Sequence, residues 1–145
     1  MPPLRETADI KALKKGLKDG TIDCICSNHN PHDEEGKKLE FVYAKPGVIA
    51  LETTFAVSRT HLEKVLDIEE LVSKLAIYPR RLLGLEVPVI AEGNEANLCL
   101  FKPDETWTCT EQDIYSKSRN TPFIGKKLTG KVLATMNNGK VWKRD

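Results

Sequence analysis

The sequence lacks any large excess of charge, any long apolar run and any dense group of cysteines. Its 145 residues include 22 Lys and Arg against 21 Asp and Glu, so the formal net charge is +1. A balanced charge offers no attraction to nucleic acid or to anionic membranes, and no apolar stretch approaches the ~20 residues that cross a bilayer. Because no secretory leader pattern opens the chain, we expect a cytoplasmic protein that binds neither nucleic acid nor membrane.

Cysteine is sparse, and its spacing does not fit a small secreted scaffold held by disulfides. Cys24, Cys26 and Cys99 lie in apolar, strand-like runs, and Cys109 follows later. Since free cysteine is often buried, we expect the first three to be reduced residues of the core. The length suits one ordinary domain, but a complete (β/α)8 barrel needs about 200 residues or more.

Reactive side chains gather just after a short apolar run at residues 22–27, which predicts a buried strand. His29 and His32, two of the three histidines, follow that run. Reactive groups beyond the carboxyl end of a strand are typical of α/β-barrel active sites. With Cys24 and Cys26 the histidines also form a pattern that could bind zinc. Because these cysteines are closer together than in usual zinc knuckles, a small zinc or interaction module stays an alternative.

A helix is predicted immediately upstream of this run. Thr7 is a candidate N-cap, and Ile10, Leu13 and Leu17 recur at helical spacing. Gly20 then provides a stop. We expect the apolar stripe of this helix to pack on a sheet, as in a βα repeat.

The remainder of the first half combines a charged segment with further helices. Residues 33–45 indicate a solvated loop or, alternatively, a mobile loop over a site. We expect a helix over about 48–61 and a second one opened by a capping box of Asp67 and Glu70. Pro79 is expected to stop or kink the second helix.

From about residue 85 the pattern changes from helical to strand-like. Residues 87–90, 98–101 and 107–109 read as strands, and 102–104 reads as a turn. Asn-Gly at 138–139 lies between two apolar runs and predicts a terminal β-hairpin. We therefore expect two structural zones with a boundary near residue 85.

Several motifs occur along the chain in the order and with the spacing of one known family. On them, the chain resembles dihydroorotases of the multifunctional-complex type, which belong to the amidohydrolase superfamily. An ordered set of motifs is more specific than any one motif. The motifs are Met-Pro-Pro-Leu-Arg at 1–5, Asp-Gly-Thr-Ile-Asp-Cys-Ile at 19–25, Ser-Asn-His-Asn-Pro-His at 27–32, Ala-Leu-Glu-Thr at 50–53, Glu-Gly…Ala-Asn-Leu at 92–98 and Tyr-Ser-Lys-Ser-Arg-Asn-Thr-Pro-Phe-Ile-Gly at 115–125.

The resemblance implies an α/β fold: the C-terminal portion of an amidohydrolase TIM barrel, followed by strands of the small β-sandwich that flanks it. Residues 1–84 would be the barrel portion and residues 85–145 the sandwich portion. Only about the last third of the family's length is matched, so barrel and sandwich should both be incomplete. We therefore expect exposed apolar surface and open strand edges, and a homo-oligomer that covers them.

The resemblance also implies a reaction and a site. In the family, zinc-bound hydroxide opens the cyclic amide of dihydroorotate to give carbamoyl aspartate in pyrimidine biosynthesis. Asn28 falls on the family's acid–base aspartate, which is also a metal ligand. His32 falls on a histidine that binds the substrate carboxylate, and Pro46 and Gly47 fall where loop backbone meets the substrate ring. Arg5, Arg119 and Asn120 match signature positions, and we expect them to pack and hydrogen-bond between barrel and sandwich.

Two departures bear on activity. An amide at Asn28 cannot act as a general base and is a poor zinc ligand, and the remaining family ligands lie upstream of the matched region. We therefore expect this chain alone to bind no zinc and to be inactive. An alternative is a non-catalytic, dihydroorotase-like scaffold that partners aspartate carbamoyltransferase.

Overall fold

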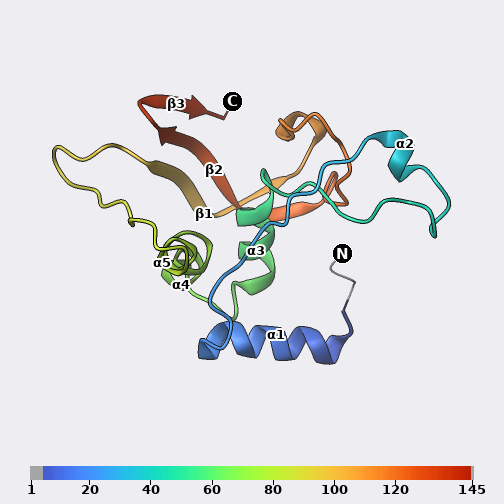
Figure 1. The fold of residues 1–145 in the computed structure, drawn as a ribbon, viewed down its shortest axis with the longest axis horizontal. Helices are drawn as coiled ribbons and strands as arrows, with labels where there is room; N and C mark the ends of the chain where they lie inside the picture. Colours follow the sequence, from blue (N-terminus) through green and yellow to red (C-terminus); the bar gives the residue numbers. More distant parts are fainter. Residues whose placement is uncertain (1–4, 145) are drawn as a thin grey trace.

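In a computed structural model, which describes residues 5–144, the N-terminal helix and a three-stranded antiparallel sheet lie on opposite sides of the helix Thr54–Leu62 (Figure 1). Residues 1–4 of the Met-Pro-Pro-Leu-Arg motif lie outside the described residues. The order is α1 (Thr7–Asp19), α2 (Glu34–Lys37), α3 (Thr54–Leu62), α4 (Ile68–Val72), π-helical η1 (Ser73–Ile77), α5 (Tyr78–Leu82), β1 (Leu98–Thr108), 3-10 helical η2 (Glu111–Asp113), β2 (Lys127–Asn137) and β3 (Lys140–Lys143).

Helix α1 forms where its apolar periodicity predicts it, but its surroundings differ from the expectation. Glu6, not Thr7, is its N-cap, and its backbone N–H donates to Asp9 at 3.3 Å. Gly20 ends the helix in the left-handed conformation, as predicted. The expected packing of the stripe on a sheet is wrong for the described residues, because Ile10 and Leu13 remain 44% and 46% exposed.

Residues 22–27 are extended, but they belong to no sheet among residues 5–144, so the predicted buried strand is not formed. Within this segment, Cys24 is half-buried and Cys26 exposed. Cys99 is exposed too, whereas Cys109 is the fully buried cysteine. All four are free, as expected, but the prediction that the first three are core residues was wrong.

Helix α3 starts later than the predicted helix over 48–61. The backbone N–H of Ile49 donates to the carbonyl of Asn120 at 3.1 Å, and those of Ala50 and Leu51 donate to His29. These long-range bonds hold residues 49–51 outside the helix, so α3 begins at Thr54.

The capping box of Asp67 and Glu70 opens α4 as predicted. Pro79 does not end the helical path. The helix widens into the π turn η1, where the N–H of Tyr78 reaches back to Ser73, and Pro79 then sits in the first turn of α5. Because proline has no backbone N–H, the helical path continues through this position without a hydrogen bond donated by residue 79. Gly84 follows with φ +67.

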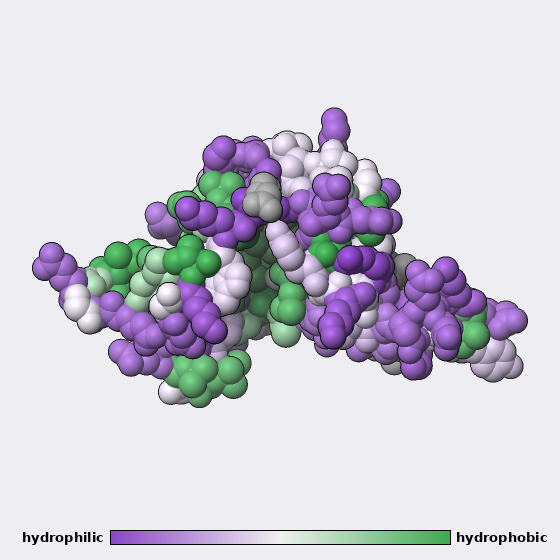
Figure 2. All heavy atoms as spheres, turned by 90° about the horizontal axis from the view of Figure 1, so that it is seen from above, coloured by the Kyte–Doolittle hydropathy of each residue, from purple (hydrophilic) through white to green (hydrophobic). Residues whose placement is uncertain are grey.

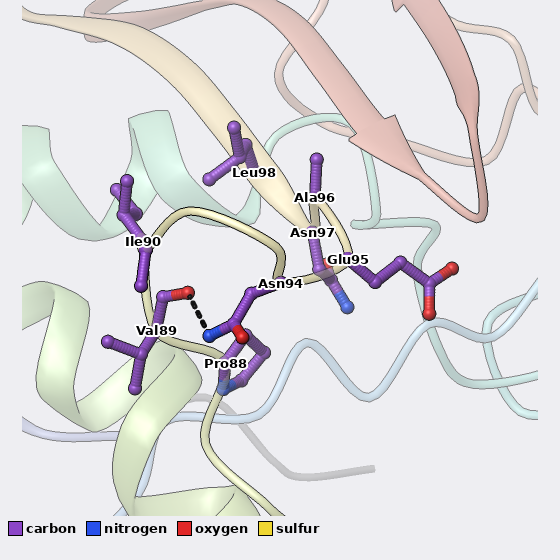
Figure 3. Close-up of a pocket in the computed structure, with 9 residues that line it drawn as sticks. Pro88, Val89, Ile90, Asn94, Glu95, Ala96, Asn97 and Leu98 are labelled. Atoms are coloured by element: carbon purple, nitrogen blue, oxygen red, sulfur yellow. Dashed lines mark hydrogen bonds between the residues drawn. The ribbon is translucent and has the colours of Figure 1, made fainter.

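The segment after α5 contains no strand until Leu98, so the strand predicted at 87–90 is wrong. Pro88 lacks a backbone donor, and Ile90 is 86% exposed with no strand beside it. The loop closes on itself through a hydrogen bond from Asn94 to the carbonyl of Val89 at 3.2 Å (Figure 3).

The sheet has the order β1-β2-β3. The predicted hairpin is confirmed: Asn137 pairs with Lys140 across a turn in which Asn138 and Gly139 both have positive φ. Residues 102–104 are not a turn. They lie inside β1, where the register shifts between Lys102 and Thr106. Proline is admitted in a sheet at such edge irregularities.

The core lies between α3, the sheet and the segment that joins β1 to β2. Its members, all at most 4% exposed, are Ile49, Ala56, Cys109, Ile114 and Leu128. Helix α3 packs against β2 at Gly130, where a Cβ would lie 2.9 Å from a ring carbon of Phe55. The core therefore draws on residues from both sides of residue 85, and the division at that point stays a prediction.

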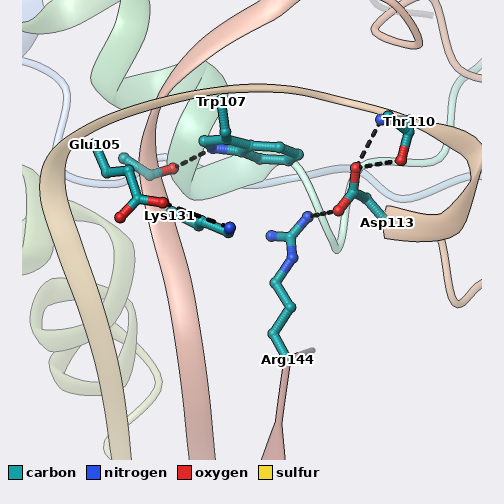
Figure 4. A network of polar contacts seen from close by, with 7 residues as sticks. Glu105, Trp107, Thr110, Asp113, Lys131 and Arg144 are labelled. Atoms are coloured by element: carbon teal, nitrogen blue, oxygen red, sulfur yellow. Dashed lines mark hydrogen bonds and ion pairs between the residues drawn. The ribbon is translucent and has the colours of Figure 1, made fainter.

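Polar contacts fasten the C-terminal strand over this core. Arg144 pairs with Asp113 and stacks over the ring of Trp107 at 4.2 Å from its centroid (Figure 4). Asp113 also accepts from the backbone N–H and hydroxyl of Thr110, each at 2.7 Å. The indole N–H of Trp107 donates to the carbonyl of Gly130 at 2.9 Å.

Exposed apolar surface is extensive, as predicted. Phe41, Val42 and Ile90 are 97%, 84% and 86% exposed, and Figure 2 shows green residues and an apolar recess among polar side chains. A groove of about 700 Å³ also opens between the start of α3 and the sheet, with Phe55 and Trp142 in its lining. Within residues 5–144, no helix is long and apolar enough to cross a membrane.

Candidate functional site

The loop at residues 28–32, which follows the segment 22–27, and the stretch around Gly47 lie side by side. The Nε2 atom of His32 is 3.0 Å from the carbonyl oxygen of Pro46. Asn30 donates its backbone N–H to the carbonyl of Val48 at 2.9 Å and its side-chain amide to that of Pro46 at 3.3 Å. The structure thus brings together three of the four predicted site residues, His32, Pro46 and Gly47.

Gly47 is required by the closeness of this contact. Its φ is +114, a conformation essentially restricted to glycine. A Cβ on this residue would lie only 2.4 Å from the side-chain nitrogen of Asn30. The backbone at Gly47 therefore lies close to Asn30, and its approach to a substrate ring stays a prediction.

Asn28, the fourth predicted residue, stands where the extended segment ends. It is exposed and has φ +44, and asparagine is among the few residues that accept the left-handed region readily. The change of direction at Asn28 ends the extended segment and starts the loop that carries His32. Its side chain is a neutral amide, which offers this position hydrogen bonds but no base.

The loop at residues 28–32 and the stretch at 46–48 form a loop cluster, and Asn120 joins it to the C-terminal half of the chain. Its side-chain amide donates to the carbonyls of Asn30 at 2.9 Å and of Gly47 at 3.3 Å, and its Oδ1 accepts from the backbone N–H of His32 at 3.3 Å. Its own carbonyl accepts from Ile49. The hydrogen-bonding role expected for Asn120 is confirmed. One amide side chain thus bonds to three backbone groups from two separate loop segments.

His29, which the sequence analysis named only as a possible zinc ligand, and Glu52, which it did not select, hold the cluster from the other side. Nδ1 of His29 accepts from the backbone N–H groups of Ala50 and Leu51 at 3.1 and 3.2 Å, so the neutral ring carries its proton on Nε2. Glu52 accepts from the N–H and hydroxyl of Ser116, both at 2.6 Å. Spacing along the chain gives no signal for either contact, because the donors lie 21 to 64 residues away.

The environment of Glu52 favours its charged form. Partial burial raises the pKa of this carboxyl, but hydrogen bonds from Ser116 and from the backbone N–H of Glu52 itself outweigh burial, so the pKa lies below its ordinary value. Its second oxygen, Oε2, is buried and has no hydrogen-bond partner among residues 5–144. Buried polar atoms usually have a hydrogen-bond partner, so the hydrogen bonding of this carboxylate is only half satisfied.

The segment 33–45 is largely exposed, as predicted for a solvated loop, and it includes a short helix. Asp33 caps the short helix α2 by accepting from the N–H of Gly36 at 2.6 Å. Lys37 then donates to the carbonyls of Lys45 at 2.7 Å and Gly47 at 3.1 Å. This lysine closes the segment onto the candidate site. A mobile cover over the site stays a prediction.

The donor set does not fit a zinc centre. In the part of the chain that is described, no three His, Cys, Asp or Glu side chains lie where they could hold a metal ion. The zinc pattern of Cys24, Cys26, His29 and His32 is therefore not assembled, and Nδ1 of His29 is occupied by backbone donors. A module organised around these four ligands is excluded for this structure.

Comparison with known proteins identifies amidohydrolases and dihydroorotases as relatives. The sequence matches the model of the Amidohydrolase family over residues 3–142. Dihydroorotase from Geotalea daltonii is 43% identical over 146 residues, which cover 99% of this chain and 34% of that protein. Dihydroorotase from Clostridium acetobutylicum is 44% identical over 142 residues, covering 97% and 34%. The chain thus spans about a third of the length of these relatives.

Solved structures of hydantoinases resemble the fold of this chain. D-hydantoinase from Thermus sp. has a TM-score of 0.84 and 28% identity, covering 99% of this chain and 33% of that one. L-hydantoinase from Arthrobacter aurescens has a TM-score of 0.84 and 28% identity, covering 97% and 33%. The fold is therefore the predicted one: a portion of an amidohydrolase TIM barrel with a small antiparallel sheet beside it. On the evidence of the family model, which matches nearly its whole length, the chain belongs to the amidohydrolase family.

Proposed function

We propose that this chain is the C-terminal portion of a dihydroorotase. The complete enzyme would catalyse the reversible hydrolysis of the cyclic amide of dihydroorotate to carbamoyl aspartate in pyrimidine biosynthesis. The observation that carries the proposal is the 43% identity to a dihydroorotase across 99% of this chain. The loop cluster supports it, because His32 and the backbone of Pro46 and Gly47 lie together at one edge of the fold.

The roles we assign follow from the chemistry of these groups. The imidazole of His32 donates to a substrate carboxylate, in competition with its contact to the carbonyl of Pro46. The backbone at Pro46 and Gly47 lies along the substrate ring. Asn28 occupies the position of the proton-transfer group, which an amide cannot serve because it does not titrate.

By itself, the chain is proposed to be inactive. The family reaction depends on zinc, and the described residues do not supply a zinc ligand set. We assign no catalytic step to a metal in this chain. Assayed alone with dihydroorotate or carbamoyl aspartate, the purified chain should give no turnover that rises with its concentration.

A chimera tests the proposal directly. The C-terminal third of the Clostridium acetobutylicum dihydroorotase would be replaced by this chain, so that the upstream two thirds come from the relative. We expect the Asn28→Asp chimera to be about 10²–10⁴-fold more active than the Asn28 chimera, which is the usual worth of general acid–base catalysis. In the Asn28→Asp chimera, His32→Ala should raise KM for dihydroorotate.

Asn138→Asp is the matched control, since Asn138 has a similar φ of +48 but lies in the β2–β3 turn. It should leave the activity of either chimera unchanged. A folded, metal-loaded Asn28→Asp chimera without dihydroorotase activity would contradict the proposed function.

Asn28 also favours a second candidate function: a non-catalytic scaffold that partners aspartate carbamoyltransferase. A protein that does not catalyse the reaction does not require a carboxylate at this position. Sedimentation of the chain with purified aspartate carbamoyltransferase would test it, with a co-sedimenting complex as the expected result. Independent sedimentation of the two proteins at all concentrations would remove this candidate.

A further inference from the structure

The loop cluster has no regular structure of its own to hold its shape. Residues 28–32 and 46–48 belong to no helix or strand, so no ladder of backbone hydrogen bonds fixes their geometry. A backbone hydrogen bond from Asn30 to Val48 at 2.9 Å joins the two segments. The placement of His32 and Gly47, which the proposed function assigns to the substrate, therefore depends on side-chain donors and acceptors.

Asn120 uses its whole amide on this cluster. An asparagine side chain has two N–H donors and one carbonyl acceptor. The nitrogen donates to the carbonyls of Asn30 at 2.9 Å and of Gly47 at 3.3 Å, and the oxygen accepts from the backbone N–H of His32 at 3.3 Å. The orientation of the amide is therefore fixed, because turning it over would place its oxygen against two carbonyl oxygens.

These bonds hold backbone and leave the imidazole free. At His32 the bond goes to the backbone N–H, so the ring can turn from the carbonyl of Pro46 to a substrate carboxylate while its backbone stays in place. At Gly47 the carbonyl accepts from Asn120 and also from the side chain of Lys37 at 3.1 Å. Two donors fix the direction of that carbonyl, and with it the plane of the peptide bond that follows.

The segment that carries Asn120 is itself well supported. The carbonyl of Asn120 accepts from the N–H of Ile49, which is 1% exposed, at 3.1 Å. Just before it, the guanidinium of Arg119 donates to the carbonyls of Ile114 and Ser116, both at 2.8 Å. The segment is thus joined to the core and closed on itself. Such support is what a side chain needs to hold other groups in place.

We propose that Asn120 is a positioning residue for the substrate, acting through His32 and Gly47 and touching no substrate atom. The inference rests on the proposed function, in which the imidazole binds the carboxylate of dihydroorotate and the backbone at residues 46–47 lies along its ring. Carboxylate and ring belong to one small molecule, so both contacts form only when the two protein groups stand at the right separation. Asn120 bridges these groups and so sets that separation.

The activity of the chimera tests this role. In the Asn28→Asp chimera, Asn120→Ala should raise KM for dihydroorotate by about 10–10²-fold, since misplacement by about 1 Å can cost about 10²-fold. The value of kcat should change much less, because the groups that Asn120 holds bind substrate and do not transfer its proton. Asn120→Asp is a second variant of nearly the same size. It keeps the acceptor for His32 but loses both donors, so it should raise KM at least as much.

A double-mutant cycle shows whether the effect passes through His32. With His32→Ala present, Asn120→Ala should raise KM several-fold less than it does alone, since a missing imidazole cannot be misplaced. The effect that remains reports on Gly47.

Leu128→Ala is the control for a loss of stability without a change at the cluster. Leu128 is 2% exposed and lies in the core with Ala56 and Cys109. Leu128→Ala should lower the urea midpoint of the chimera about as much as Asn120→Ala does, and it should leave KM unchanged.

Other results would overturn the proposal. An active Asn28→Asp chimera in which Asn120→Ala leaves KM unchanged would remove the positioning role and leave the proposed function standing. Equal effects in both His32 backgrounds, or an equal rise of KM in Leu128→Ala, would mean that Asn120 does not act through the imidazole. Loss of folding in both Asn120 variants would make the residue purely structural. A folded, metal-loaded Asn28→Asp chimera without activity would contradict the proposed function, and this inference would fall with it.

Discussion

The segment around Cys26 and the segment around Cys109 are both extended, apolar and cysteine-bearing, yet only the second is buried. Cys109 donates to the carbonyl of Lys126 at 3.0 Å and accepts from Gly125 at 2.7 Å, and α3 and the sheet enclose it. Cys26 has no backbone partner between residues 5 and 144. A local pattern thus predicts extended backbone, whereas burial depends on which neighbouring elements are present.

Truncating a side chain in the enclosed region should have the largest effect. Leu128 is 2% exposed and belongs to the core around Cys109. Leu128→Ala should lower the free energy of unfolding by about 2–5 kcal/mol, because it leaves a cavity. Urea denaturation measures the loss. Leu100→Ala, at a residue that is 61% exposed, is the control and should cost far less; equal losses would contradict the contrast between the two regions.

Asn120 links the two regions, so its removal comes next. Asn120→Ala deletes three side-chain hydrogen bonds to backbone groups of the loop cluster. At about 0.5–1.5 kcal/mol each, the free energy of unfolding should fall by about 1.5–4.5 kcal/mol. Hydrogen exchange at His32 should accelerate as well. Asn97→Ala, at an exposed position, should change neither quantity.

The outcome at Asn120 illustrates what the sequence could tell. Its place in a recognisable motif marked it as a hydrogen-bonding residue, and the capping box of Asp67 and the Asn-Gly hairpin were equally readable, since each depends on residues close in sequence. The start of α3 was not, because Asn120 and His29 draw the backbone of residues 49–51 away from the helix. Three of the four residues selected by resemblance lie together, but the hydrogen bonds of His29 and Glu52 could be found only from the fold.

Exchanging sulfur for oxygen sharpens the comparison of the two cysteines. Cys109→Ser buries a hydroxyl and should cost about 1–3 kcal/mol of unfolding free energy, whereas Cys26→Ser should be nearly neutral. Burial, followed by nearby Asp113, raises the pKa of the Cys109 thiol. Iodoacetamide should therefore modify Cys26 well before Cys109 in the native protein, as followed by mass spectrometry. Equal rates would mean that the enclosed region opens readily.

Acid should produce the smallest effect. Burial raises the pKa of Asp113, but hydrogen bonds from Arg144 and Thr110 outweigh it and hold the pKa below its ordinary value. Stability from this carboxylate is thus present above its unfolded pKa and is lost as pH falls through the lower, folded value. Asp113→Asn should lower stability at neutral pH and flatten the acid limb of a denaturation series. An unchanged acid limb would argue against the Arg144 pairing.

Arg144 concentrates three contacts in one residue. It supplies the ion pair to Asp113, the cation over Trp107 and a backbone N–H to the carbonyl of Leu133 at 2.8 Å. Arg144→Ala would remove the first two contacts together. The β2–β3 hairpin would then lose its side-chain fastening, and an endoprotease would digest it more readily.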